Sequence, residues 1–81
     1  MPTKAYILIE TAVAKSRSVS EALRSIPGIH TVDAVTGPYD IIAITEGPDL
    51  NALGDLVTSH IHSINGIIRT VTCLSVGQPK S

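Results

Sequence analysis

The sequence predicts an α+β domain of the ferredoxin-like type, in which two helices cover one face of a four-stranded antiparallel sheet in the order βαββαβ. Two apolar stretches at helical spacing alternate with four stretches rich in β-branched residues. Each predicted helix also ends at a glycine that leads directly into a strand. The exit sequence of residues 25–29 (SIPGI) recurs at residues 63–67 (SINGI), which indicates two βαβ halves of the same design.

The first half begins with residues 4–11 (KAYILIET), which are predicted to form a strand because they are mostly apolar or β-branched. A capping box, in which the Ser18 hydroxyl accepts from the Glu21 amide, predicts the start of a helix. Apolar residues follow at helical spacing at Val19, Leu23 and Ile26. Pro27-Gly28 ends this helix, and residues 29–36 form the second strand.

The second half begins after a turn at residues 37–40, with a near-continuous apolar strand at residues 41–46 that suggests burial on both faces. Asp49 is the predicted N-cap of the second helix. The helix stripe runs through Leu50, Leu53, Val57, Ile61 and Ile64. Asn65-Gly66 ends the helix, residues 67–76 form the fourth strand, and residues 77–81 are expected to be a loose tail.

Composition limits the classes of protein. The 81 residues make a single domain, 1–81, and the net charge of −1 excludes a strongly basic nucleic-acid binder. The only cysteine, Cys73, cannot form an intrachain disulfide, and we expect it to be a small core residue in a reducing, cytoplasmic setting. No apolar run is long enough for a membrane span or a signal peptide.

Both alternating sets of side chains in the first and fourth strands are rich in apolar residues. In the first strand Ala5, Ile7 and Ile9 alternate with Tyr6 and Leu8, and in the fourth Ile68 and Leu74 alternate with Ile67, Val71 and Cys73. Two helices can cover only one face, and a bare apolar face would be a large exposed patch. The sequence therefore predicts that the second face packs against another chain, most simply in a two-fold dimer.

Two groups of polar residues are candidates for binding. In the turn, Gly37 lets a ligand approach the backbone, Asp40 can accept from an ammonium and Thr36 offers a hydroxyl. Local chemistry alone favours a plain hairpin turn in which Asp40 satisfies a nearby amide. Thr70 and Thr72 share one side of a strand and could form half of a polar pocket, or could simply reflect the β-propensity of threonine.

No combination of residues predicts catalysis, a metal or a cofactor. His60 and His62 would point about 200° apart on a helix and cannot share an ion, so they and His30 are interpreted as surface histidines. Cys73 has no basic neighbour in the sequence, and the carboxylates show no paired spacing. The sequence also lacks phosphate-binding and dinucleotide-binding glycine motifs.

The element order, the exit SIPGI, the turn TGPYD and the ending INGIIRTVTCLSV together resemble the ligand-binding (RAM) domain of Lrp/AsnC transcriptional regulators over residues 4–76. The resemblance implies dimers formed through the sheets, of the dimeric α+β barrel type, that assemble into rings such as octamers. It implies an effector amino acid bound between dimers, lined by Gly37, Tyr39 and Asp40, with Thr70 and Thr72 contributed by the final strand of the same or a neighbouring subunit. Asp40 would hold the ligand ammonium, and amides near Gly37 its carboxylate.

Full-length members of that family carry an N-terminal helix-turn-helix domain, whereas this chain starts at the first strand of the ligand-binding domain. We therefore expect a stand-alone form that senses an amino acid, or co-assembles with full-length regulators, without binding DNA and without catalysis. Three alternatives remain: a small dimeric α+β barrel enzyme of the monooxygenase or isomerase kind, an ACT-like regulatory domain, and a structural adaptor.

Overall fold

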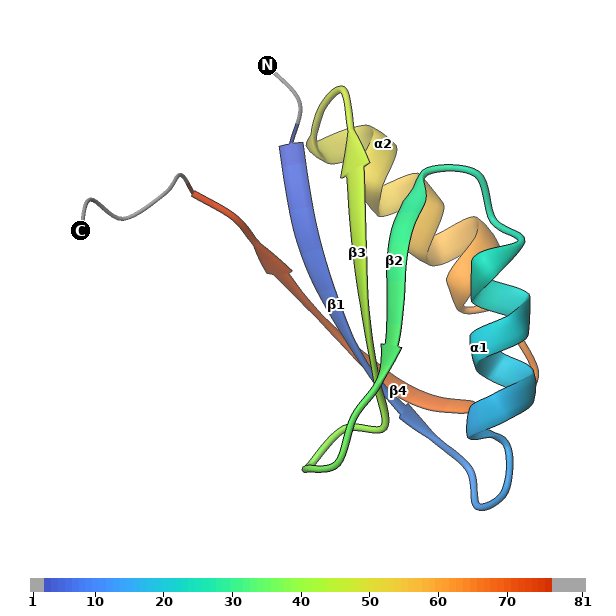
Figure 1. Cartoon of the computed structure of the whole chain (residues 1–81). Coiled ribbons are helices and arrows are strands. Elements are labelled where there is room, and N and C mark those ends of the chain that lie inside the picture. The colour runs from blue at the N-terminus through green and yellow to red at the C-terminus, as the bar shows by residue number, and fades with distance from the viewer. Residues whose placement is uncertain (1–2, 77–81) are drawn as a thin grey trace.

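The computed structural model describes residues 3–76, which form four strands and two helices (Figure 1). In chain order the elements are β1 (Thr3–Thr11), α1 (Ser16–Arg24), β2 (Ile29–Ala34), β3 (Ile41–Gly47), α2 (Leu50–Asp55) with its continuation η1 (Leu56–Ile61), and β4 (Ile67–Leu74). The sheet is antiparallel, with strand order β2-β3-β1-β4. Both helices lie on one face, so the predicted fold class is confirmed (Figure 1).

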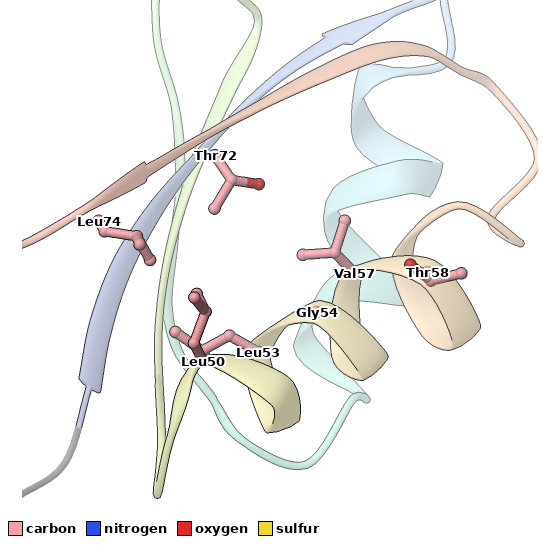
Figure 2. Close-up of a pocket in the computed structure, with 7 residues that line it drawn as sticks. All are labelled: Leu50, Leu53, Gly54, Val57, Thr58, Thr72 and Leu74. Atoms are coloured by element: carbon pink, nitrogen blue, oxygen red, sulfur yellow. The ribbon is translucent and has the colours of Figure 1, made fainter.

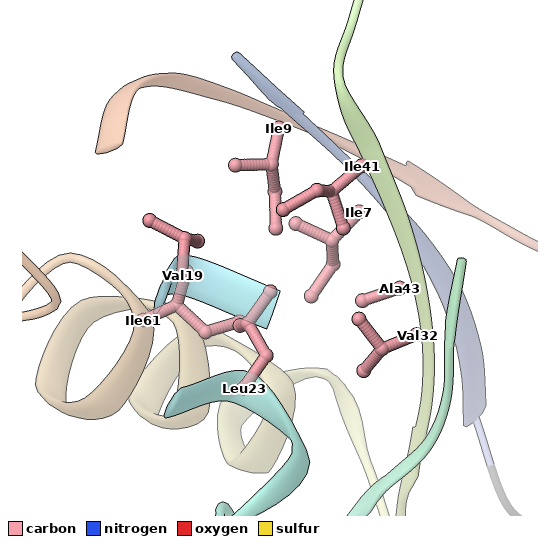
Figure 3. Packing of buried hydrophobic residues seen from close by; sticks show 8 residues of the cluster. All are labelled: Ile7, Ile9, Val19, Leu23, Val32, Ile41, Ala43 and Ile61. Carbon is pink, nitrogen blue, oxygen red and sulfur yellow. The ribbon is translucent and has the colours of Figure 1, made fainter. Parts of the chain in front are cut away.

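The register of the sheet sorts its side chains into two faces. Ile7 of β1 pairs with Ala43 of β3 and with Thr72 of β4. Residues that are directly opposite on neighbouring strands point to the same face of the sheet. This face meets the helices and holds the core, shown in Figure 3: Ile7, Ile9, Val19, Leu23, Val32, Ile41, Ala43 and Ile61. The strands thus contribute alternate residues to the core, and the helices contribute the residues on the side that faces the sheet.

The two predicted helix exits have the backbone conformation that requires glycine. Gly28 has φ +95° and Gly66 has φ +106°, and each precedes a strand by one residue. The strand limits lie close to those predicted, although β2 ends at Ala34 rather than 36 and β4 ends at Leu74 rather than 76. Residues 77–81, predicted to be a loose tail, lie outside the described residues.

The predicted capping box at Ser18 is wrong. Helix α1 begins at Ser16 with Lys15 as N-cap, and no side chain caps it. Ala14, at φ +66°, turns the chain early, and the Lys15 amide then donates to the Ala12 carbonyl at 3.0 Å. Ser18 therefore lies inside the helix, where its hydroxyl donates to the Lys15 carbonyl at 3.1 Å instead of accepting from an amide.

The second helix is shorter and less regular than predicted. Asp49 is the N-cap as expected, and its carboxylate accepts from the Ala52 amide at 2.8 Å. The α-helix then widens into the π-helical segment η1, where the His62 amide donates to the Val57 carbonyl at 2.9 Å. The helix ends at Ile61 rather than near 64, and Leu50, the first residue of the predicted stripe, is 59% exposed.

Within the described residues, no helix covers the other face of the sheet. Tyr6, Leu8, Ile42, Ile44, Val71 and Cys73, hereafter the open face, are half-buried or exposed there. The prediction that Cys73 is a core residue is wrong for the single chain, because β4 turns this thiol away from the helices and it is exposed. Within residues 3–76, no helix has the length and apolar character needed to cross a membrane.

Candidate functional site

The turn of residues 36–40 joins β2 to β3 and projects from the end of the sheet, away from the helices (Figure 1). Thr36 and Gly37 are exposed, whereas Tyr39 and Asp40 are half-buried. The hairpin is closed by the Val35 amide, which donates to the Asp40 carbonyl at 2.9 Å. The tip of the turn is therefore accessible, while its second half is fixed to the sheet.

Asp40 is held in place by β1. Its Oδ2 accepts from the Thr11 amide at 2.8 Å, and its own amide donates to the Ile9 carbonyl at 2.9 Å. The amide that Asp40 satisfies is thus distant in the sequence, so the prediction that it satisfies a nearby amide of the turn is wrong. An ionised carboxylate has about four lone-pair sites, so one such bond leaves capacity to accept from a ligand.

Gly37 leaves room above the backbone. Among residues 3–76, no heavy atom beyond its chain neighbours lies within 4 Å of the position that a Cβ would occupy on Gly37. Its φ is also outside the positive range that demands glycine. The space above this residue, rather than its dihedral angles, is what lets another molecule approach the backbone amides of the turn.

Two charged residues beside the turn were not identified from the sequence. The Arg69 guanidinium lies over the Tyr39 ring, 5.7 Å from its centroid, and Arg69 Nε lies 3.6 Å from Glu10 Oε1. Glu10 and Arg69 are directly paired across β1 and β4, on the same side of the sheet as the open face. Glu10, Tyr39 and Arg69 are distant in the sequence, so only the register of the strands shows that they lie together.

Thr70 and Thr72 lie on the opposite side of the sheet from the Tyr39–Arg69 contact. They pair with Ile9 and Ile7, whose side chains face the helices. The Thr70 hydroxyl is hydrogen-bonded to His62 Nε2 at 3.0 Å. The six predicted residues therefore form two groups, with Thr36, Gly37, Tyr39 and Asp40 in one and the two threonines in the other.

Thr72 faces a cavity of about 300 Å³ between the second helix and β4 (Figure 2). The cavity is lined by Leu50, Leu53, Gly54, Val57, Thr58, Thr72 and Leu74. Its walls are mainly aliphatic, and the two threonine hydroxyls are the polar side-chain groups among them. Sequence reasoning selected Thr72 but missed the aliphatic residues, which look like ordinary core positions.

Histidines do not form a metal centre in the part of the chain that the structure describes. No group of three or more His, Cys, Asp or Glu side chains in residues 3–76 is placed to hold an ion. His62 contacts Thr70, and His30 Nε2 lies 3.3 Å from Glu46 Oε1. The arrangement therefore offers one polar and one aliphatic binding surface.

The Lrp/AsnC ligand binding domain family matches residues 4–81. Among curated proteins, an HTH-type transcriptional regulator of Pyrococcus horikoshii is 30% identical over 76 residues, which are 90% of this chain and 51% of that protein. The regulator LysM of Saccharolobus solfataricus is 28% identical over 83% of this chain and 47% of its own length. The chain thus spans about half the length of these curated relatives.

Solved structures have the same fold. TTHA0845 from Thermus thermophilus is 33% identical with a TM-score of 0.91, covering 98% of this chain and 99% of that one. AsnC of E. coli has the same fold, with a TM-score of 0.90 at 21% identity over 98% of this chain and 54% of that one. The Neisseria meningitidis regulator NMB0573, solved as an L-Met complex, has a TM-score of 0.86 at 21% identity over 98% and 53%. With the family match over nearly its whole length, this chain belongs to the Lrp/AsnC family through its ligand-binding domain.

Proposed function

We propose that this chain is an amino-acid-sensing and self-assembling effector module, which modulates transcription or amino-acid metabolism through ligand binding and assembly. The observation that carries the proposal is the fixed Asp40 carboxylate beside the accessible backbone at Gly37. An α-amino acid presents an ammonium and a carboxylate on one carbon. Asp40 is the acceptor for the ammonium, and the turn amides are donors for the carboxylate.

The neighbourhood of the turn suits a zwitterion. Arg69 adds a cation beside Tyr39, and Glu10 adds an anion next to Arg69. Opposite charges at short range favour a ligand that carries both signs. The Neisseria regulator with bound L-Met has the same fold, which supports an amino acid as the effector class.

Assembly is the second part of the proposal. The open face is apolar at its centre, with Leu8, Ile42 and Ile44 only half-buried. Packing two such faces together removes this surface from water, and a chain of 8.5 kDa buries little surface by itself. We therefore assign the open face to a two-fold dimer.

A second kind of contact between copies follows from the position of the threonines. Thr72 faces the helices and the Tyr39–Arg69 contact lies across the sheet, so one ligand can touch both groups only between two copies. Ligand binding would then strengthen a higher oligomer such as an octamer. Full-length Lrp/AsnC regulators, which share this fold, would be the partners of this chain in mixed assemblies.

The test is the mass of the chain in solution by light scattering, with and without each amino acid at millimolar concentration. We expect a dimer or larger species, and a shift toward a higher oligomer with one amino acid or a few. A species of 8.5 kDa at micromolar concentration would contradict the assembly proposal. A mass that no amino acid alters would argue against coupling between ligand and assembly.

A further inference from the structure

We infer that Arg24 closes the β2 edge of the sheet to strand pairing with another copy of this chain, and so directs self-association to the other surfaces. The β2 edge is distinct from the turn, the cavity and the open face. Neither amino-acid binding nor the open-face dimer is assumed. The direction of the backbone groups of β2, and the contact of Arg24 with one of them, point to this role.

β2 is an edge strand. In the order β2-β3-β1-β4, its one strand neighbour within residues 3–76 is β3. The free side of an edge strand presents backbone N–H and C=O groups that can pair with a strand of another molecule. Native proteins therefore protect such edges by short strands, charged side chains, bulges or covering elements.

The β2–β3 hairpin shows which backbone groups of β2 face outward. The Val35 amide donates to the Asp40 carbonyl, so these two residues form a hydrogen-bonded pair. Along the same register, hydrogen-bonded pairs alternate with pairs that are not bonded to each other. Asp33 is therefore bonded to β3, whereas the N–H and C=O groups of Val32 and Ala34 point away from the sheet.

Arg24 occupies one of these outward groups. It is the last residue of α1, which lies beside β2 (Figure 1), and its Nη2 donates to the Val32 carbonyl at 3.3 Å. A charged donor makes a stronger hydrogen bond than a neutral one. A second strand could pair with this part of β2 only by displacing the guanidinium from its acceptor.

A bulge protects the other end of β2. The register shifts between Ile29 and Thr31, so His30 has no partner across the ladder. Bulges disrupt regular pairing and are a common way of protecting sheet edges. The regular part of the edge is thus limited to residues 31–34, and Arg24 occupies an acceptor within it.

The opposite edge of the sheet is built differently. β4 has eight residues against six in β2, and within residues 3–76 no side chain is hydrogen-bonded to its backbone. The Ser75 amide donates to the Lys4 carbonyl, so by the same alternation the amides of Thr72 and Leu74 point outward. Arg24 therefore acts on one edge only, and these two β4 amides serve as an internal reference.

Amide hydrogen exchange of the full chain by NMR, at low and high protein concentration, tests the inference, and light scattering gives the mass. In the wild type, the Val32 and Ala34 amides should exchange at a rate that does not depend on concentration. In Arg24→Ala we expect a larger mass at high concentration. Exchange at these two amides should then slow by about tenfold, because each gains a backbone hydrogen bond. Thr72 and Leu74 should exchange as in the wild type.

Two further variants separate edge pairing from other causes. Arg17→Ala removes the same charge from an exposed position of the same helix and should keep the wild-type mass and exchange. Adding Ala34→Lys to Arg24→Ala puts a charge on the exposed edge, which opposes strand pairing, and should restore the wild-type mass. Because alanine favours helix, Arg24→Ala should keep the native circular dichroism.

Several results would overturn the inference. Slower exchange of Val32 and Ala34 in the concentrated wild type would mean that the edge is open despite Arg24, and this measurement holds even if Arg24→Ala does not fold. The same is true of an Arg24→Ala variant with the wild-type mass, or of a larger species whose two amides stay unprotected. Equal association of Arg17→Ala would assign the effect to charge alone. None of these results touches the proposed function, which is tested on the unmodified chain with amino acids.

Discussion

The Asp40 carboxylate accepts a hydrogen bond of 2.8 Å from the backbone amide of Thr11, a residue 29 positions earlier in the chain. This bond joins the candidate ligand turn to the end of β1. Thr11 is only 9% exposed, so its amide depends on Asp40 for a partner. Asp40 therefore has a structural role that its proposed role in ligand binding does not replace.

The two roles of Asp40 can be separated by two substitutions. Asp40→Ala leaves the Thr11 amide without its acceptor and is expected to cost about 1–3 kcal/mol of unfolding free energy in urea titrations. Asp40→Asn keeps an oxygen acceptor and removes the charge, so stability should change less. Calorimetric titration should find that both variants lose amino-acid binding. If Asp40→Asn binds as tightly as the wild type, the carboxylate is not the ammonium partner.

The two equivalent helix exits are expected to respond differently to alanine. Both Gly28 and Gly66 have positive φ, and an L-residue there costs about 1–2 kcal/mol. A Cβ on Gly28 would meet no atom within 4 Å, whereas a Cβ on Gly66 would lie 3.0 Å from Lys15 Cβ and 3.1 Å from Val19 Cγ2. Gly66→Ala should therefore be the more destabilising variant in thermal unfolding. Equal losses would contradict the packing of this exit against α1.

A charge on the open face should prevent self-association. Ile44 lies at the centre of that face and is half-buried, so Ile44→Glu would place a carboxylate inside the proposed dimer interface. We expect a monomer by light scattering, with native circular dichroism. Val13→Glu, at a fully exposed loop residue, is the control and should keep the wild-type mass. An unchanged mass for Ile44→Glu would place the interface elsewhere.

The chain itself should not bind duplex DNA. It has six Lys and Arg against seven Asp and Glu, and Arg69 is engaged with Tyr39 and Glu10. Binding through phosphates requires several clustered cations. Fluorescence anisotropy with duplex DNA at physiological salt should remain at the value of free DNA. Saturable binding at micromolar protein would contradict the assignment as an effector module.

Sequence patterns were sufficient for the fold because the local signals agree with one another. The alternation of apolar residues in β1 and the glycine exits at Gly28 and Gly66 each point to the same topology. The start of α1 was not predictable from Ser18, since the turn at Ala14 determines where the helix begins. The π-helical segment has no signal in the spacing of Val57 and Ile61 that distinguishes it from an α-helix.

The candidate site was only partly predictable. The spacing of Thr70 and Thr72 correctly puts both on one side of β4, but the side depends on the irregular register between Glu10 and Thr11. The Arg69–Tyr39 and Asp40–Thr11 contacts join residues that are distant in the sequence, so only the folded sheet brings them together.

Thermal unfolding of the full chain with each standard amino acid at millimolar concentration tests the central claim most directly. A ligand at 100 times its dissociation constant stabilises the folded state by about 2.7 kcal/mol. For a domain of this size, that corresponds to a rise in Tm on the order of ten degrees. We expect such a rise with one or a few amino acids, and its loss in Asp40→Asn. An unchanged Tm with every amino acid would contradict it.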